Sequence, residues 1–181
     1  FYRVAYDHRA AARAVRDAGY EPRPIESSEN EAKKPTLMGV DADFLRHLTE
    51  LREIIEPSAA ALAATSRSTE QLESIAQALR TMEAASTIAQ WVQADLEFHT
   101  AVLKATNNPL LMPLAAIIGS ALESLLGVTA RTSDNFKQAL PDHQKVFDAI
   151  RLQEPQNALH RMAGMLSDTR SLIRATIQPD T

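Results

Sequence analysis

Two side chains of metal-ligating type lie four residues apart in the middle of the chain. Asp95 and His99 fall on the apolar face of a predicted helix, which is formed by Trp91, Val92, Phe98, Val102 and Leu103. Residues four apart in a helix project from the same side one turn apart, so this carboxylate and this imidazole can converge on one atom. Burying an unpaired carboxylate is costly, so the pattern indicates a partner inside the fold. A cation is one such partner.

Polar side chains interrupt apolar faces in two other predicted helices. His143 lies on the apolar face of the helix predicted at 140–152, three residues before Val146 and four before Phe147. Arg52 lies on the apolar face of the helix predicted at 41–55, among Leu48, Leu51 and Ile55. One acid, two imidazoles and one guanidinium therefore point inward from three helices. Oxygen and nitrogen ligands of this kind suit a borderline divalent metal such as zinc, nickel or manganese.

Structural alternatives exist for each of these residues. His143 can be a hydrogen-bonded core residue, and Asp95 with His99 can be a simple ion pair. Arg52 can pair with Glu56 one helical turn further on, or with Asp95 itself. The sequence alone leaves a metal site and a set of structural pairs both open.

The composition indicates which elements position these residues. The chain has 181 residues, of which 45% are hydrophobic and only 5% aromatic, with 5 glycines and no cysteine. Abundant Ala, Leu, Glu, Gln and Arg favour helices over strands, so we expect one all-α domain. The absence of cysteine excludes disulfides and thiolate sites and favours a reducing cytoplasm. The net charge of −4 argues against this chain coating nucleic acid by itself.

Apolar periodicity and polar breaks predict an antiparallel bundle of six to seven helices. The expected ranges are 41–55, then 59–64 after a kink or restart at Pro57, a helix capped by Ser68 or Thr69, and 86–106, 108–131, 140–152 and 155–176. Residues 1–36 read as a short helix and a Pro-rich linker, and residues 37–181 as the main domain. We find no signal peptide and no apolar stretch that reaches the roughly 20 residues of a membrane span.

Four motifs in order along residues 41–175 resemble a known family. They are residues 51–57 with the Ala-rich 59–64, residues 95–99, residues 105–110 and residues 143–150. Together they are similar to the FCD effector domain, the carboxy-terminal domain of FadR-type GntR transcription regulators. The sequence around His143 is closest in pattern to the galactonate-operon repressor branch. The resemblance implies a helical bundle, a homodimer, and a central cavity for a metal and a small carboxylate effector.

The resemblance also implies roles for particular residues. In metal-binding members the ligands correspond to Asp95, His99 and His143, and a further His on the last helix corresponds to Met165 here. A three-ligand site, weaker or completed by the effector, is therefore expected.

For the effector, which we expect to be a small carboxylate such as a sugar acid, the predicted binding residues are Arg52, Arg131 and Asn108. The planar fork of arginine suits carboxylates. Operator DNA is expected to be read through an amino-terminal winged helix-turn-helix domain. Residues 9–19 are similar to its recognition helix, but the Gly-rich wing is missing, so this domain is expected to be largely absent from the chain.

Two other functions compete with a ligand-sensing regulator. A metal-dependent hydrolase would also hold a metal with three protein ligands and an open position, but it needs a general base, and the sequence predicts no inward Glu near the ligands. A metal-free helical interaction domain would use the inward polar residues structurally. We therefore expect a regulator domain that is not an enzyme.

Overall fold

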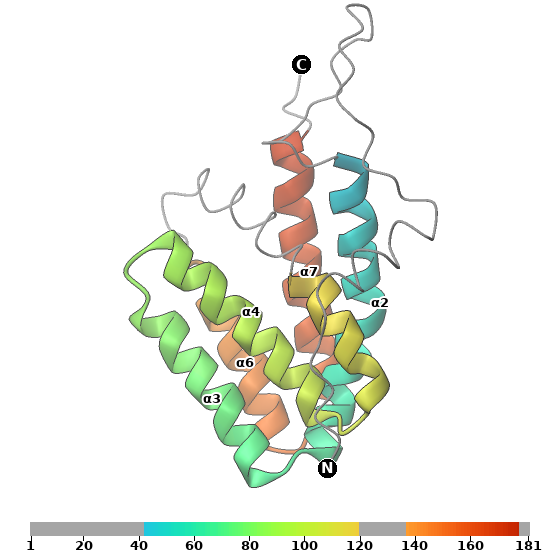
Figure 1. The fold of residues 1–181 in the computed structure, drawn as a ribbon, viewed down its shortest axis with the longest axis vertical. Helices are drawn as coiled ribbons and strands as arrows, with labels where there is room; N and C mark the ends of the chain where they lie inside the picture. The colour runs from blue at the N-terminus through green and yellow to red at the C-terminus, as the bar shows by residue number, and fades with distance from the viewer. Residues whose placement is uncertain (1–41, 120–136, 178–181) are drawn as a thin grey trace, which may run out of the picture. The chain divides into compact units, whose positions relative to one another are not determined.

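The computed structural model describes residues 42–119 and 137–177 of the chain (Figure 1). These residues form helices and turns and contain no strand, which confirms the predicted all-α fold. The elements are α2 (Ala42–Ser66), α3 (Thr69–Ala84), α4 (Ile88–Ala105), the short 3-10 helix η1 (Pro109–Leu111), α6 (Leu140–Arg151) and α7 (Pro155–Ile177). Residues 112–119 are also helical.

Local sequence signals explain where two of these helices begin. Ser68 is the N-cap of α3, as predicted, and its hydroxyl accepts a hydrogen bond from the backbone N–H of Gln71. The Gln71 side chain in turn accepts from the backbone N–H of Ser68. Thr87 and Gln90 form the same reciprocal cap at the start of α4. Each reciprocal cap provides hydrogen-bond acceptors for backbone N–H groups that have no partner within the helix at its start.

The first long helix follows one of the two alternatives predicted at Pro57, because α2 continues through this residue instead of restarting after it. Proline has no N–H, so the carbonyl of Glu53 loses its helical partner at this point. Beyond Pro57 the alanines at 59, 60, 63 and 64 are all buried. Small side chains allow neighbouring helices to approach closely, and α2 packs against α4, α6 and, most extensively, α7.

Figure 1 shows α2 and α7 side by side, and α3 and α4 as an antiparallel pair joined by a short connection. The main core lies among α2, α3, α4, α6 and α7, and its largest fully buried side chains include Trp91, Phe98 and Ile150. A second small cluster packs residues 112–119 against α2 and α4 through Ala59, Leu103, Ala115 and Ile118. The bundle thus directs one face each of α2, α4 and α6 toward a shared interior.

Some of the predicted features lie outside the described residues. They are the amino-terminal segment 1–36 and the second half of the helix predicted at 108–131, with Arg131. Within the described ranges, no helix is both long enough and apolar enough to cross a membrane.

Candidate metal centre

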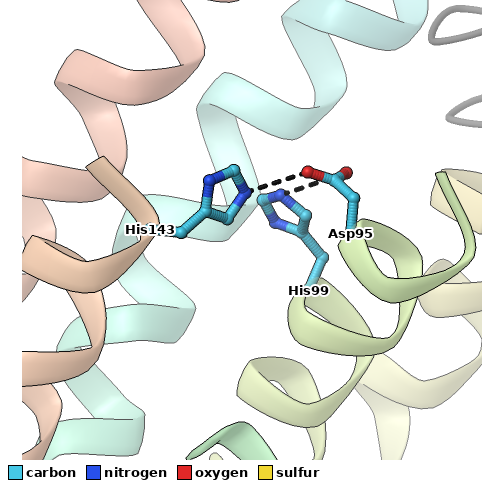
Figure 2. Close-up of side chains that lie close together, drawn as sticks. All are labelled: Asp95, His99 and His143. Carbon is cyan, nitrogen blue, oxygen red and sulfur yellow. Dashed lines mark ion pairs between the residues drawn. The ribbon is translucent and has the colours of Figure 1, made fainter. Parts of the chain in front are cut away.

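The structure brings Asp95, His99 and His143 together although they come from two helices. Figure 2 shows the two α4 side chains, Asp95 and His99, facing the imidazole of His143 from α6. One ligand-type atom from each residue lies within 4.8 Å of the others. All three are buried, with exposed fractions of 4%, 2% and 2%.

The backbone fixes which nitrogen of His143 faces the site. Its Nδ1 lies 2.8 Å from the carbonyl oxygen of Ala139, one turn back in the chain. A carbonyl can only accept, so Nδ1 carries the proton, and Nε2 of the neutral ring has a free lone pair. That Nε2 lies 2.9 Å from Oδ1 of Asp95. Two acceptors this close and buried require a positive centre between them, either a proton or a metal ion.

One buried atom of Asp95 and one of His143 make no hydrogen bond among the described residues. They are Oδ2 of Asp95 and Nε2 of His143. Buried polar groups without a hydrogen-bond partner are uncommon in folded proteins, and where they occur a bound ion often satisfies them. The donor set and its unsatisfied atoms therefore fit a divalent metal.

The second imidazole is oriented by the carboxylate of Glu56, which the sequence analysis considered only as a partner of Arg52. Nδ1 of His99 forms an ion pair with Oε2 of Glu56, and Nε2 of His99 lies 3.7 Å from Oδ2 of Asp95. A carboxylate on one imidazole nitrogen is the common arrangement by which proteins present the other nitrogen to a metal. Glu56 is thus an inward Glu beside the predicted ligands, contrary to expectation. Its spacing of four residues from Arg52 predicted the Arg52–Glu56 pair, but no spacing along the chain places Glu56 beside His99.

Arg52 joins Glu56, Asp95, His99 and His143 in one cluster of buried polar side chains. Its Nε donates to Oε1 of Glu56 at 2.6 Å, the pairing considered as an alternative from sequence, and its Nη2 lies 3.1 Å from Nε2 of His99. Both members of the Arg52–Glu56 pair are almost fully buried. The guanidinium therefore links α2 to α4 at the imidazole of His99.

The two carboxylates of the cluster are ionised. Burial by itself would raise the pKa of Glu56, but the charges and hydrogen bonds of Arg52 and His99 outweigh it and lower the pKa to about 2. Burial likewise opposes ionisation of Asp95, and His99, His143 and Arg52 together lower its pKa to about 2. Arg52 and the proton that Asp95 and His143 share in the absence of a metal ion together balance the two negative charges of Glu56 and Asp95.

Aromatic side chains pack against the two imidazoles. The ring of His143 packs edge-on against Phe98 and Trp91, with centroid distances of 5.0 and 6.1 Å. Met165, at the position of the family's last His, is buried in the main core. Such an apolar shell limits the access of water and strengthens electrostatic interactions inside it.

The other predicted site residues lie elsewhere or outside the described ranges. The structure does not bring Asn108 to the cluster, because it is exposed and its side-chain oxygen accepts a hydrogen bond from the backbone N–H of Leu110, which caps η1. Arg131 falls in the segment 120–136, outside the described residues. His160, interpreted as a surface residue, is exposed on α7.

Comparison with known proteins decides the family. Residues 47–168 match the FCD domain. The chain belongs to the FCD domain family. This confirms the resemblance found in the sequence.

Curated relatives of this FCD domain are regulators of transcription. It is 32% identical over 139 residues to the galactonate operon transcriptional repressor of Escherichia coli (strain K12), and the match covers 75% of this chain and 61% of the relative. It is 29% identical over 134 residues to the HTH-type transcriptional repressor NanR of Enterobacter sp. (strain 638), covering 67% of this chain and 50% of NanR. The chain thus spans between half and two thirds of these repressors, which are regulators rather than enzymes.

Among solved structures, Streptococcus agalactiae GntR has a similar fold. The TM-score is 0.61 and the sequence identity is 24%, and the match covers 88% of this chain and 80% of the other. This likeness supports the helical fold of the domain.

Proposed function

We propose that this FCD domain is the effector-sensing and dimerising part of a bacterial transcription regulator. In this proposal Asp95, His99 and His143 bind one divalent metal, and a small carboxylate completes its coordination. The observation that carries the proposal is the buried contact of 2.9 Å between Oδ1 of Asp95 and the lone-pair nitrogen of His143. A metal ion supplies the positive centre that these two acceptors lack.

Charge and coordination both favour an anionic effector. A divalent ion in place of the proton between Asp95 and His143 would change the net charge of the described cluster from zero to +1, and three protein ligands leave positions open for oxygen donors. The donor set suits zinc, nickel or manganese alike. Because one relative is a galactonate operon repressor, sugar acids are the first class of effector to test.

The link to DNA follows from dimer geometry. An effector that binds one arrangement of a dimer more tightly shifts the population toward that arrangement, and thereby sets the spacing of attached DNA-reading domains. In this proposal operator DNA is read by a winged helix-turn-helix domain on the amino-terminal side of the FCD domain, and the regulator acts in the cytoplasm.

A hydrolase remains poorly supported even though Glu56 lies inward. A general base must be free to take a proton from a metal-bound water. Glu56 is instead held by Arg52 at 2.6 Å and by His99, and its pKa is about 2. The other alternative, a metal-free interaction domain, predicts that divalent metals leave the protein unchanged.

The first test is a thermal-shift screen of sugar acids and simple carboxylates, each with and without zinc. Zinc alone is expected to raise the melting temperature, and an effector acid to raise it further only when zinc is present, because ligands that bind the folded state stabilise it. Neutral sugars of the same carbon skeleton are the control. Equal shifts for acids with and without zinc would contradict the proposal of a metal-assisted site.

The second test is the oligomeric state. We expect light scattering at micromolar concentration to give about twice the chain mass of 19.9 kDa. Exposed apolar side chains such as Ile54 and Leu110, which are 73% and 81% exposed, are consistent with a covered surface. A monomer mass over this concentration range would remove dimerisation from the proposal.

A further inference from the structure

One atom of the cluster is required for two different contacts. Nε2 of His99 accepts a hydrogen bond from Nη2 of Arg52 at 3.1 Å, and it is also the nitrogen that faces Oδ2 of Asp95. An imidazole nitrogen has a single lone pair, so it cannot accept from Arg52 and coordinate a metal at the same time. The other nitrogen of the ring is already engaged by Glu56, so turning the ring over would lose that ion pair.

We propose that Arg52 and the metal compete for Nε2 of His99, and that metal binding releases Arg52 to bind the carboxylate of the effector. This inference rests on the proposed metal site and adds a regulatory step to it. In the metal-free protein Arg52 is the internal cation of the cluster. In the metal-bound protein it becomes an effector-binding residue.

The charges of the cluster favour this order of events. Without metal, Arg52 and the proton between Asp95 and His143 balance the two carboxylates, Glu56 and Asp95, so an incoming anion meets no net positive charge. With a divalent ion the cluster has a charge of +1 and attracts a carboxylate, which neutralises it. Metal therefore binds first and the effector second.

The contacts of Arg52 allow a partial release. Its Nε–H donates to Oε1 of Glu56 at 2.6 Å, a contact between residues four apart on α2 that does not depend on α4. Its Nη2 contact with His99 joins two helices and is the one a metal would replace. Arginine has five N–H donors, so Arg52 can keep Glu56 and still offer two parallel donors to a carboxylate.

The variant Arg52→Lys distinguishes two effects on metal binding: the hydrogen bond from residue 52 to His99, and the positive charge of its side chain. The lysine side chain ends one bond earlier, where the guanidinium carbon lies, so the ammonium can keep Glu56 but ends short of His99. The net charge is unchanged. If the hydrogen bond to His99 competes with the metal, Arg52→Lys should bind zinc more tightly than the wild type, by about tenfold.

Zinc alone is titrated by calorimetry into the wild type, Arg52→Lys and the control Arg46→Lys. Arg46 pairs with Glu50 at the same spacing on the same helix, but both side chains are about half exposed. We expect tighter binding by Arg52→Lys and wild-type affinity for Arg46→Lys. Equal or weaker zinc binding by Arg52→Lys would overturn the competition, while leaving the metal site intact. No zinc binding by any of the three proteins would instead overturn the proposed metal site, and the competition with it.

A measurement on the wild type covers the case in which Arg52→Lys does not fold. Nitrogen-15 NMR follows the Arg52 guanidinium and the His99 ring during addition of zinc. We expect the Arg52 Nε–H to stay protected by Glu56, while exchange of its Nη protons accelerates as Nε2 of His99 becomes metal-bound. Zinc binding with unchanged Nη protons would contradict the release of Arg52.

Discussion

Replacing His143 with alanine is expected to reduce zinc affinity by at least about 100-fold. Loss of a residue that only orients a ligand costs about 10- to 100-fold in many metal sites, and His143 would be a ligand itself. Its Nε2 is buried, lies 2.9 Å from Oδ1 of Asp95, and makes no hydrogen bond among the described residues. Calorimetric titration of wild type and variant with zinc measures the difference.

The control for this experiment is His160→Ala, because His160 is an exposed imidazole on α7. It should bind zinc as the wild type does. A second variant, Asp95→Asn, keeps the side-chain volume and removes the charge, and it should lose zinc affinity to a similar degree. Unchanged affinity in both His143→Ala and Asp95→Asn would show that any zinc binds elsewhere.

Glu56→Gln is expected to lower the free energy of unfolding by about 3 kcal/mol, because removing one partner of a buried ion pair leaves the other charge uncompensated. Arg52 would lose its contact of 2.6 Å, and His99 would lose the carboxylate on Nδ1. Urea unfolding in the presence of a chelator measures this effect without metal. Zinc affinity should fall as well, since Glu56 orients a proposed ligand.

The effect of Glu56→Gln should depend on pH in a defined direction. The pKa of Glu56 is lowered from 4.5 to about 2, so the folded protein favours the ionised carboxylate. This contribution is fully present above the unfolded pKa near 4.5 and is lost as the pH falls toward 2. The stability difference between wild type and variant should therefore be large at pH 7 and shrink between about pH 5 and pH 2.

The matched control is Glu50→Gln, whose partner Arg46 lies four residues before it on the same helix. That pair is about half exposed, so the change should cost less than about 1 kcal/mol. If Glu50→Gln and Glu56→Gln destabilise the protein equally, the buried cluster does not have the energetic role assigned to it.

The sequence by itself determined the helices and the inward direction of single residues. Helical periodicity depends on neighbours in the chain, so the face that carries Asp95 and His99 could be assigned without tertiary information. The sequence likewise narrowed the N-cap of α3 to Ser68 or Thr69, and the structure has it at Ser68. Asn108 caps η1 through its side-chain oxygen, and its binding of the effector stays a prediction.

Only the tertiary structure decided how residues from different helices combine. Whether His143 of α6 meets Asp95 of α4 depends on how both helices pack against α2, and no spacing along the chain encodes that distance. The roles of Glu56 and Arg52 also required the fold, because their helical spacing predicts a pair but not the contact of that pair with His99. Periodicity reports which way a side chain points, whereas the partner it reaches is set by helix packing.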